Sequence, residues 1–473
     1  MANRYWVGGT GNWNDTGHWS TASGGSSGAS VPGTSDDAFF DGSSGTGTAT
    51  VNVAATPKSV DFTGYEGGFT LGANITTQGS FVLVSGMTFT PSTYAVTINN
   101  TGTLTSGGKA FYDLSMSANG KGAVTFTLGD DVTVNNTLTF QGGDGSTVTL
   151  TGNTYYAKGN VTFGSNADTF SGTSNLICNG TGNQTLTGYA SSFVKFNIDV
   201  QSGGGTFYFA GTLRFGGGKT LDISSGTIDT TTNTAKLQFD AQAGNGTYTD
   251  AVGVTWYDVA FRAYGAYTVT LNNDITCSHA LTFTGNNGTT MTINGSDIIA
   301  QGTISDSTST DIISGTSDLI INGGANQTWT GGNALTYAFA SITINKSGNT
   351  LYLAGTIKTK TSVWTYTAGT VDASSNTNTL VITGSLTLNS NGISWYNITH
   401  SSANTCTLSS SLTITNLLSM ASNVSTTYSG AYNISTKDFE INGTSTTTLS
   451  GDITCSGNFD FNKVTGNKSI NGS

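Results

Sequence analysis

Hydrophobic and polar residues alternate one by one over many short segments of this chain. In residues 124–128 (VTFTL), 132–134 (VTV), 138–140 (LTF) and 148–150 (VTL), apolar side chains take every second position and threonine the positions between. The same alternation returns in residues 269–271, 275–277, 281–283, 291–293, 386–388 and 412–414. A period of two, broken by Gly, Asn or Asp, is typical of strands that bury only one face.

A longer repeat is superimposed on the strands. Residues 173–188 read TSNLICNGTGNQTLTG and residues 316–331 read TSDLIINGGANQTWTG, an offset of 143 residues. FYDLSM at Phe111 returns as WYDVAF at Trp256 and as WYNITH at Trp395. Long repeats of about 143 residues therefore start near 111, 256 and 395, and the third is incomplete at residue 473.

The strand pattern and the repeat together predict an all-β solenoid. With 65 Gly, 3 Pro and few helix-forming residues, the chain offers no helices for a βαβ unit. A coil of three short strands with corners takes on the order of 20 residues, so one long repeat holds about seven coils. We expect a right-handed parallel β-helix over residues 59–473. Asn and Thr in register, such as Asn135, Asn272 and Asn345, would stack between coils.

The negative net charge of the chain limits the classes of partner that we expect. The net charge is −11, with charged residues at 9%, so no basic patch is expected to neutralise phosphates or anionic lipid. No apolar run approaches the roughly 18 residues of a membrane span. The start of the chain, MANRYWVGGTGNW, lacks the hydrophobic core of a signal peptide, which favours a protein released by lysis, such as a virion component, or an excised fragment.

Residues 1–58 differ from the rest and are predicted to form a small tryptophan-rich module. The pattern W-x-G-G-x-G-x-W, then W-S, then V-P-G-x-x-D-x-A-x-F-D spans about the first 45 residues. It resembles the opening module of autotransporter-like β-helix adhesins, and similar modules open phage fibre and other virion proteins. This resemblance implies a β-helical surface protein. Two roles are open for the module, and both can hold: a cap over the first coil, or attachment to another virion protein. The residues concerned are Tyr5, Trp6, Trp13 and Trp19.

The four cysteines are predicted to be buried free thiols. By repeat alignment Cys178 replaces Ile321, Cys277 replaces Val134 and Ile414, and Cys406 replaces Phe126 and Val269. Cys455 lies in the same Ile-Thr-Cys frame as Cys277. A small hydrophobe at an inward position explains all four, and no C-x-x-C or paired His spacing points to metal.

Few residues occur in a pattern that indicates catalysis or the binding of a metal ion or cofactor. Asp36, Asp37 and Asp41 are a weak candidate for structural calcium, although their spacing matches no calcium loop, and solvated turn residues are the favoured interpretation. No histidine keeps a Ser and an Asp beside it through the repeats, so a catalytic triad has no support. The glycine-rich corners are not followed by helices, so no phosphate loop and no cofactor are predicted.

The expected function is therefore a non-enzymatic structural virion protein at the virion surface: a phage fibre, spike or capsid-decorating appendage. Expected partners are other virion proteins through the N-terminal module, copies of the chain itself (a trimer favoured, as in the fibres it resembles), and host surface glycan. One alternative is a bacterial surface adhesin of the autotransporter type at the cell surface. A second is a glycan-degrading tailspike, which would need a carboxylate pair assembled across coils.

If the cysteines only fill space, Cys277→Val should leave the fold intact and lower the free energy of unfolding by less than about 1.5 kcal/mol. Urea unfolding of the variant and the parent chain measures this difference. A loss of several kcal/mol, or the loss of a bound metal ion, would refute the packing role.

Overall fold

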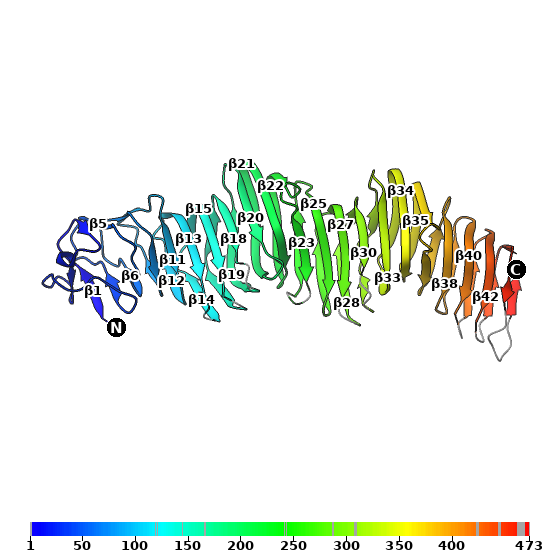
Figure 1. Ribbon diagram of the computed structural model, residues 1–473, viewed down its shortest axis with the longest axis horizontal. Helices are drawn as coiled ribbons and strands as arrows, with labels where there is room; N and C mark the ends of the chain where they lie inside the picture. Colours follow the sequence, from blue (N-terminus) through cyan, green and yellow to red (C-terminus); the bar gives the residue numbers. More distant parts are fainter. Residues whose placement is uncertain are drawn as a thin grey trace. The chain divides into compact units, whose positions relative to one another are not determined.

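The computed structural model describes residues 2–472, apart from 119, 121, 144, 165–166, 241, 243, 286–287, 307–309, 422–424, 443–445 and 461–468. Strands make up 61% of the chain and helix 1%, in stacked parallel coils of about 18 turns. This is the predicted β-solenoid. The chain divides into an N-terminal unit, Met1–Ala235, and a C-terminal unit, Lys236–Ser473. In each unit, successive strands lie side by side along the stack (Figure 1).

Three parallel ladders build the N-terminal unit. One joins β12 (Gly102–Thr105), β14 (Ala123–Leu128), β16 (Thr147–Gly152) and the start of β19 (Thr169–Cys178). The second joins β8 (Ile75–Thr77), β11 (Ala95–Ile98), β13 (Ala110–Ser117), β15 (Val132–Gln141), β18 (Asn160–Phe163) and β20 (Gln184–Gly188). The third runs from the start of β15 through β17 (Thr154–Ala157) and the end of β19 to β21 (Phe193–Phe215) and β22 (Lys219–Asp229).

In-register pairing turns the sequence alternation into rows of like side chains. On the second ladder, hydroxyl-bearing residues form one outward row across six strands: Thr76, Thr97, Ser115, Thr139, Thr162 and Thr187. Of the three asparagines predicted to make contacts between coils, Asn272 does so, because its Nδ2 donates to Thr249 Oγ1 at 2.9 Å. Because a shift by one residue would turn every outward side chain inward, the apolar–polar alternation sets this register.

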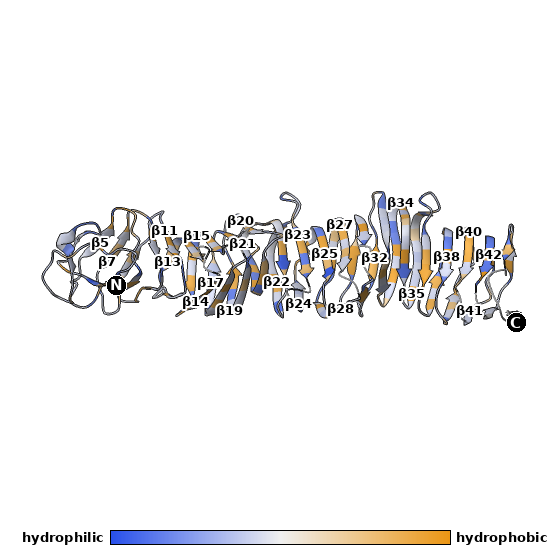
Figure 2. Ribbon diagram, turned by 60° about the horizontal axis from the view of Figure 1, so that its bottom comes forward, coloured by the Kyte–Doolittle hydropathy of each residue, from blue (hydrophilic) through white to orange (hydrophobic). Residues whose placement is uncertain are grey.

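Inward rows form the core. Val134, Ala157, Cys178, Val200 and Ile223 follow one another in register on the third ladder, and all are buried. Hydrophobic and hydrophilic residues alternate along the strands, as Figure 2 shows. The core is therefore a stack of thin layers, each closed by the coil above and the coil below.

The ladders already include strands from the first 58 residues. β1 (Asn3–Trp6) pairs in parallel with β4 (Asp37–Phe39), and β4 pairs with β6 (Ser59–Asp61). β5 (Thr48–Val51) pairs with β7 (Gly68–Leu71) in a separate four-stranded sheet. Among the described pairings, only β1 with β3 (Trp19–Ser20) is antiparallel.

The C-terminal unit repeats the parallel arrangement. One ladder runs through β23 (Lys236–Asp240), β25 (Thr255–Ala263), β27 (Ile275–Gly285), β30 (Thr303–Asp306), β33 (Gln327–Ala338) and β34 (Ser341–Thr359). It continues through β36 (Thr379–Ile382), β38 (Ser394–His400), β40 (Leu412–Met420) and β42 (Ile434–Ile441).

The corner glycines of the repeated stretch have a steric cause. Gly172 and Gly315 have φ angles of 138° and 139°, which side chains of L-residues rarely adopt. An added Cβ would lie 1.8 Å from the carbonyl oxygen of Leu150 or Ile293 in the coil below. The two copies therefore need glycine where neighbouring coils approach most closely.

Buried glutamines occupy equivalent places in the two copies. Gln184 Nε2 donates to the carbonyls of Ala157 and Gly159 at 3.0 and 2.7 Å. Gln327 Nε2 donates to the carbonyls of Ala300 and Gly302 at 3.1 and 2.7 Å. Each amide thus adds a side-chain donor at a corner, where the carbonyls of Ala157 and Ala300 also accept backbone hydrogen bonds from Asn179 and Asn322. Both glutamine side chains are 1% exposed.

Gln327 also holds a buried cation. Its Oε1 accepts a hydrogen bond from Lys346 Nζ at 2.6 Å, and the same ammonium donates to the carbonyls of Gly323 and Ala325 at 2.6 and 2.8 Å. Lys346 is 2% exposed. A buried charge is tolerated only when its donors are paired, so this corner depends on the glutamine.

Gln327→Met should lower the free energy of unfolding by about 2–4 kcal/mol, because it takes a partner from the buried ammonium and from two carbonyls. The exposed Gln301 is the matched control, and Gln301→Met should change stability by less than about 0.5 kcal/mol. Urea unfolding followed by circular dichroism compares the two. Equal effects of the two substitutions would contradict the role given to Gln327.

Candidate functional site

The tryptophans of the N-terminal module form a closed cluster. Trp6 and Trp13 each meet the Trp19 ring edge to face, with centroids 5.2 and 4.9 Å apart. Trp19 Nε1 donates to the Trp13 carbonyl at 2.7 Å, and Trp6 Nε1 donates to the Gly9 carbonyl at 2.8 Å. All three indoles are at most 1% exposed. These rings are core and leave no surface for a partner.

The cluster continues into the first coils. Trp6 stacks on Phe40 at 5.5 Å, and Phe40 stacks on Phe62 at 4.6 Å. Tyr5 differs, because it points outward, is half-buried and stacks on Phe39 at 5.1 Å. Of the four predicted cap or attachment residues, Trp6, Trp13 and Trp19 are buried in the core, and Tyr5 presents a ring on the outside.

The three aspartates that are weak calcium candidates interact with different partners. Asp36 accepts hydrogen bonds from the backbone N–H groups of Ala2 and Gly33, and Asp41 accepts one from Ser43 N–H. Asp37 forms an ion pair with Lys58 at 2.9 Å. Within the described part of the chain, no group of three or more His, Cys, Asp or Glu side chains could hold a metal ion. In the structure the three aspartates serve turns and an ion pair.

Three of the four cysteines lie where the alignment placed them. Cys178, Cys277 and Cys406 are buried and free, and burial raises the pKa of Cys277 and Cys406 to about 12 and that of Cys178 further still. The expectation for Cys455 was wrong, because it is only partly buried. Its Sγ lies 3.1 and 3.3 Å from the carbonyls of Lys437 and Asn458 instead of among apolar side chains.

The thrice-repeated aromatic–Tyr–Asp or Asn motif marks a β-bulge with a polar contact between coils. Asn136 donates to Asp113 at 2.8 Å, and Asn416 donates to Asn397 at 2.8 Å. At the middle copy, Asp258 meets His279 Nδ1 at 2.9 Å, and Tyr257 stacks on the imidazole at 4.4 Å. The contact recurs with three chemistries, so its role is to join coils.

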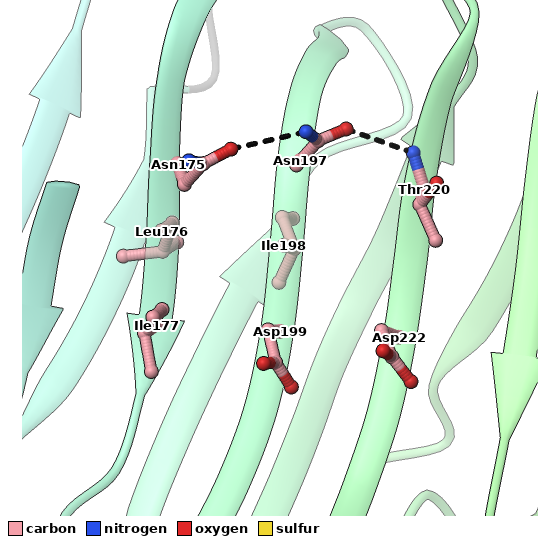
Figure 3. Close-up of a pocket in the computed structure, with 8 residues that line it drawn as sticks. All are labelled: Asn175, Leu176, Ile177, Asn197, Ile198, Asp199, Thr220 and Asp222. Carbon is pink, nitrogen blue, oxygen red and sulfur yellow. Dashed lines mark hydrogen bonds between the residues drawn. The ribbon is translucent and has the colours of Figure 1, made fainter. Parts of the chain in front are cut away.

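A surface hollow of about 280 Å³ lies on the outer face of β19, β21 and β22 in the N-terminal unit. Two rows of outward side chains cross it, one of Asn175, Asn197 and Thr220 and one of Ile177, Asp199 and Asp222 (Figure 3). Leu176 and Ile198, between these rows, point into the core and are buried. The hollow therefore combines amides, a hydroxyl, carboxylates and one aliphatic side chain.

The polar lining is held in place by hydrogen bonds. Asn197 Nδ2 donates to Asn175 Oδ1 at 3.0 Å, and Asn197 Oδ1 accepts from Thr220 N–H at 3.1 Å (Figure 3). Asp199 Oδ1 accepts from Ser224 Oγ at 2.6 Å and its Oδ2 from Gln201 Nε2 at 2.5 Å. Side chains fixed before binding lose little conformational freedom when a ligand arrives.

No sequence motif marks this hollow. Asp199 and Asp222 pair in register on neighbouring coils, although they lie far apart along the chain. In the C-terminal unit, the row that starts at Ile320 continues with Thr343 and Thr365 in place of the two acids. The sequence feature that could have revealed the hollow is a pair of acidic residues spaced by one coil, in a chain with few charged residues.

Comparisons of the chain with known protein families, with curated proteins and with solved structures give no match. In the part of the chain that the structure describes, no helix has the length and hydrophobicity that a membrane crossing needs.

One inward aromatic row in the C-terminal unit ends in a carboxyl group. Phe239, Phe261 and Phe283 stack at 5.4 and 5.6 Å, and the next position in register is Asp306. The corresponding residue beside Phe140 in the N-terminal unit is Phe163.

Burial favours the neutral form of Asp306, and a hydrogen bond from the backbone opposes it. Its Oδ2 accepts a hydrogen bond from Gly332 N–H at 3.0 Å, and the fully buried Tyr337 packs against Phe283 at 5.4 Å. Burial raises the pKa of Asp306 to about 7. The folded chain therefore binds this proton more tightly than the unfolded chain does.

Because the folded-state pKa is raised, the stability that protonated Asp306 gives is present in acid and is lost as pH rises towards 7. From pH 5 to pH 8, the parent chain should lose roughly 2–3 kcal/mol relative to Asp306→Asn. The comparison removes the opposing effect of His400, whose pKa burial lowers in both proteins. Urea midpoints across this range test the prediction, and parallel pH profiles would contradict it.

Proposed function

We propose that this chain is a non-enzymatic structural protein of a virion, a fibre, spike or capsid-decorating appendage in which the stacked coils are the shaft. The observation that carries the proposal is that side chains and backbone are used mainly to join one coil to the next. Rows of hydroxyls, bulge contacts and buried glutamines all serve that purpose. Such a body is suited to bearing load and presenting a surface.

The N-terminal module is the proposed point of attachment to other virion proteins. Its motif resembles modules that open phage fibres and β-helix adhesins, and its indoles cover the apolar end of the core. The Tyr5–Phe39 pair is the aromatic feature on the outside of this module, with both rings half-buried. Aromatic residues are enriched in the centres of protein interfaces.

Self-association, with a trimer favoured, belongs to the same proposal. The net charge of −11 is spread over 473 residues, so repulsion between the faces of neighbouring copies is weak. An adhesin on a bacterial surface is the competing assignment, because the N-terminal motif resembles both classes.

Antibody raised against the purified chain should label purified virions from the natural source, and Tyr5→Ala should reduce incorporation into particles at least tenfold. The matched control is Tyr189→Ala, which removes an exposed ring (39%) from the shaft and should leave incorporation unchanged. Circular dichroism should show the same strand content for both variants.

One result would overturn the assignment, and another would overturn the role given to Tyr5. Labelling confined to the bacterial envelope, with none on virions, would establish the adhesin instead. Normal incorporation of Tyr5→Ala would remove Tyr5 from the attachment surface.

A further inference from the structure

We infer that the hollow on β19, β21 and β22 binds a saccharide chain made of neutral or amino sugars and excludes acidic sugars. The inference deepens the proposed appendage role, since it names the chemistry that the shaft presents to a surface.

The hydrogen-bonding groups that line the hollow suit sugar hydroxyls. Sugar hydroxyls both donate and accept, and here an amide, a hydroxyl and two carboxylates face one shallow space. Polar groups placed among apolar surface fix a ligand's orientation. Ile177 supplies apolar surface within the hollow, and Tyr156 lies next to it in register on β17, half-exposed. A ring with one apolar face and a rim of hydroxyls matches this combination.

The negative charge of the lining residues favours ligands that are not acidic. Asp199 and Asp222 occupy directly paired positions, where like charges destabilise a sheet. The C-terminal unit has threonine at both places, so the fold does not require acids there. Among the lining residues of the hollow, two bear carboxylates and none bears a cationic side chain. An ammonium or hydroxyl ligand is attracted to such a site, and a carboxylate-bearing sugar is repelled.

The hydrogen bonds of Asp199 favour binding of a saccharide over its cleavage. Glycoside hydrolysis needs one carboxylic acid that gives a proton to the leaving oxygen. Both oxygens of Asp199 already accept hydrogen bonds, from Ser224 and Gln201. This arrangement fixes a carboxylate as an acceptor, which suits recognition of hydroxyl or ammonium groups.

The outer face of the coils also sets the ligand's form. Neighbouring coils repeat about every 4.8 Å along the stack, so equivalent side chains recur on a scale close to one sugar ring. The hollow is open and crosses three strands, and it can therefore hold a segment of a longer chain.

The test uses the purified full chain and three hexasaccharides: glucosamine hexamer, maltohexaose and galacturonic acid hexamer. Titration calorimetry should detect the glucosamine hexamer most strongly, maltohexaose more weakly and the galacturonic acid hexamer not at all. Affinity for the glucosamine hexamer should fall as salt rises. Asp199→Thr and Asp222→Thr, which install the residues of the C-terminal unit, should each weaken its binding at least tenfold.

Glu66→Thr is the control, since it removes one exposed negative charge elsewhere in the N-terminal unit and should change binding less than twofold. Asp199→Asn and Asp222→Asn provide a second pair that keeps side-chain size, and circular dichroism checks that each variant folds.

Several results would overturn the inference: no binding of any hexasaccharide, binding unchanged in both threonine variants, preference for the galacturonic acid hexamer, or release of new reducing ends. None of these would affect the virion assignment, because labelling and incorporation of particles are measured separately.

Discussion

Parallel, in-register hydrogen bonding between successive coils is the constraint on which the rest of this structure depends. Each coil satisfies its backbone by pairing with the coils above and below, so a strand has one face for the core and one for solvent. Alternating Val-Thr-Phe-Thr segments meet that demand at every step. An unpaired end of such a stack exposes backbone and apolar surface. In the N-terminal unit, Trp6, Trp13 and Trp19 are buried in the core.

The requirement for backbone pairing is hardest to meet at the corners, where the chain turns between strands. At the corners, side chains supply additional donors to backbone carbonyls. Gln184 and Gln327 donate to two carbonyls each, and Lys346 donates to two more. Gln184 and Gln327 occupy the same position in the two copies of the sixteen-residue stretch, whereas Lys346 lies outside it.

The strand pattern and three cysteines could be predicted because each depends only on period two and on repeat alignment. The burial of Cys455 could not be predicted, because its Sγ lies against the carbonyls of Lys437 and Asn458, a contact that repeat alignment does not encode. The hollow at Asp199 and Asp222 escaped prediction for another reason. Its residues come together through register across coils, which no local motif encodes. Asp306 likewise reads as an ordinary turn acid until its place after Phe239, Phe261 and Phe283 is known.

The register itself can be measured directly with pulsed electron spin resonance. Nitroxide labels at Thr76→Cys and Thr187→Cys, in a chain whose partly exposed Cys455 is replaced by Ser, lie on one outward row, five coil steps apart. Steps of about 4.8 Å place the two backbone sites about 24 Å apart along the stack. A single narrow distribution near that distance, widened by the label arms, is the predicted result. A broad distribution, or a mean beyond about 40 Å, would contradict stacked parallel coils.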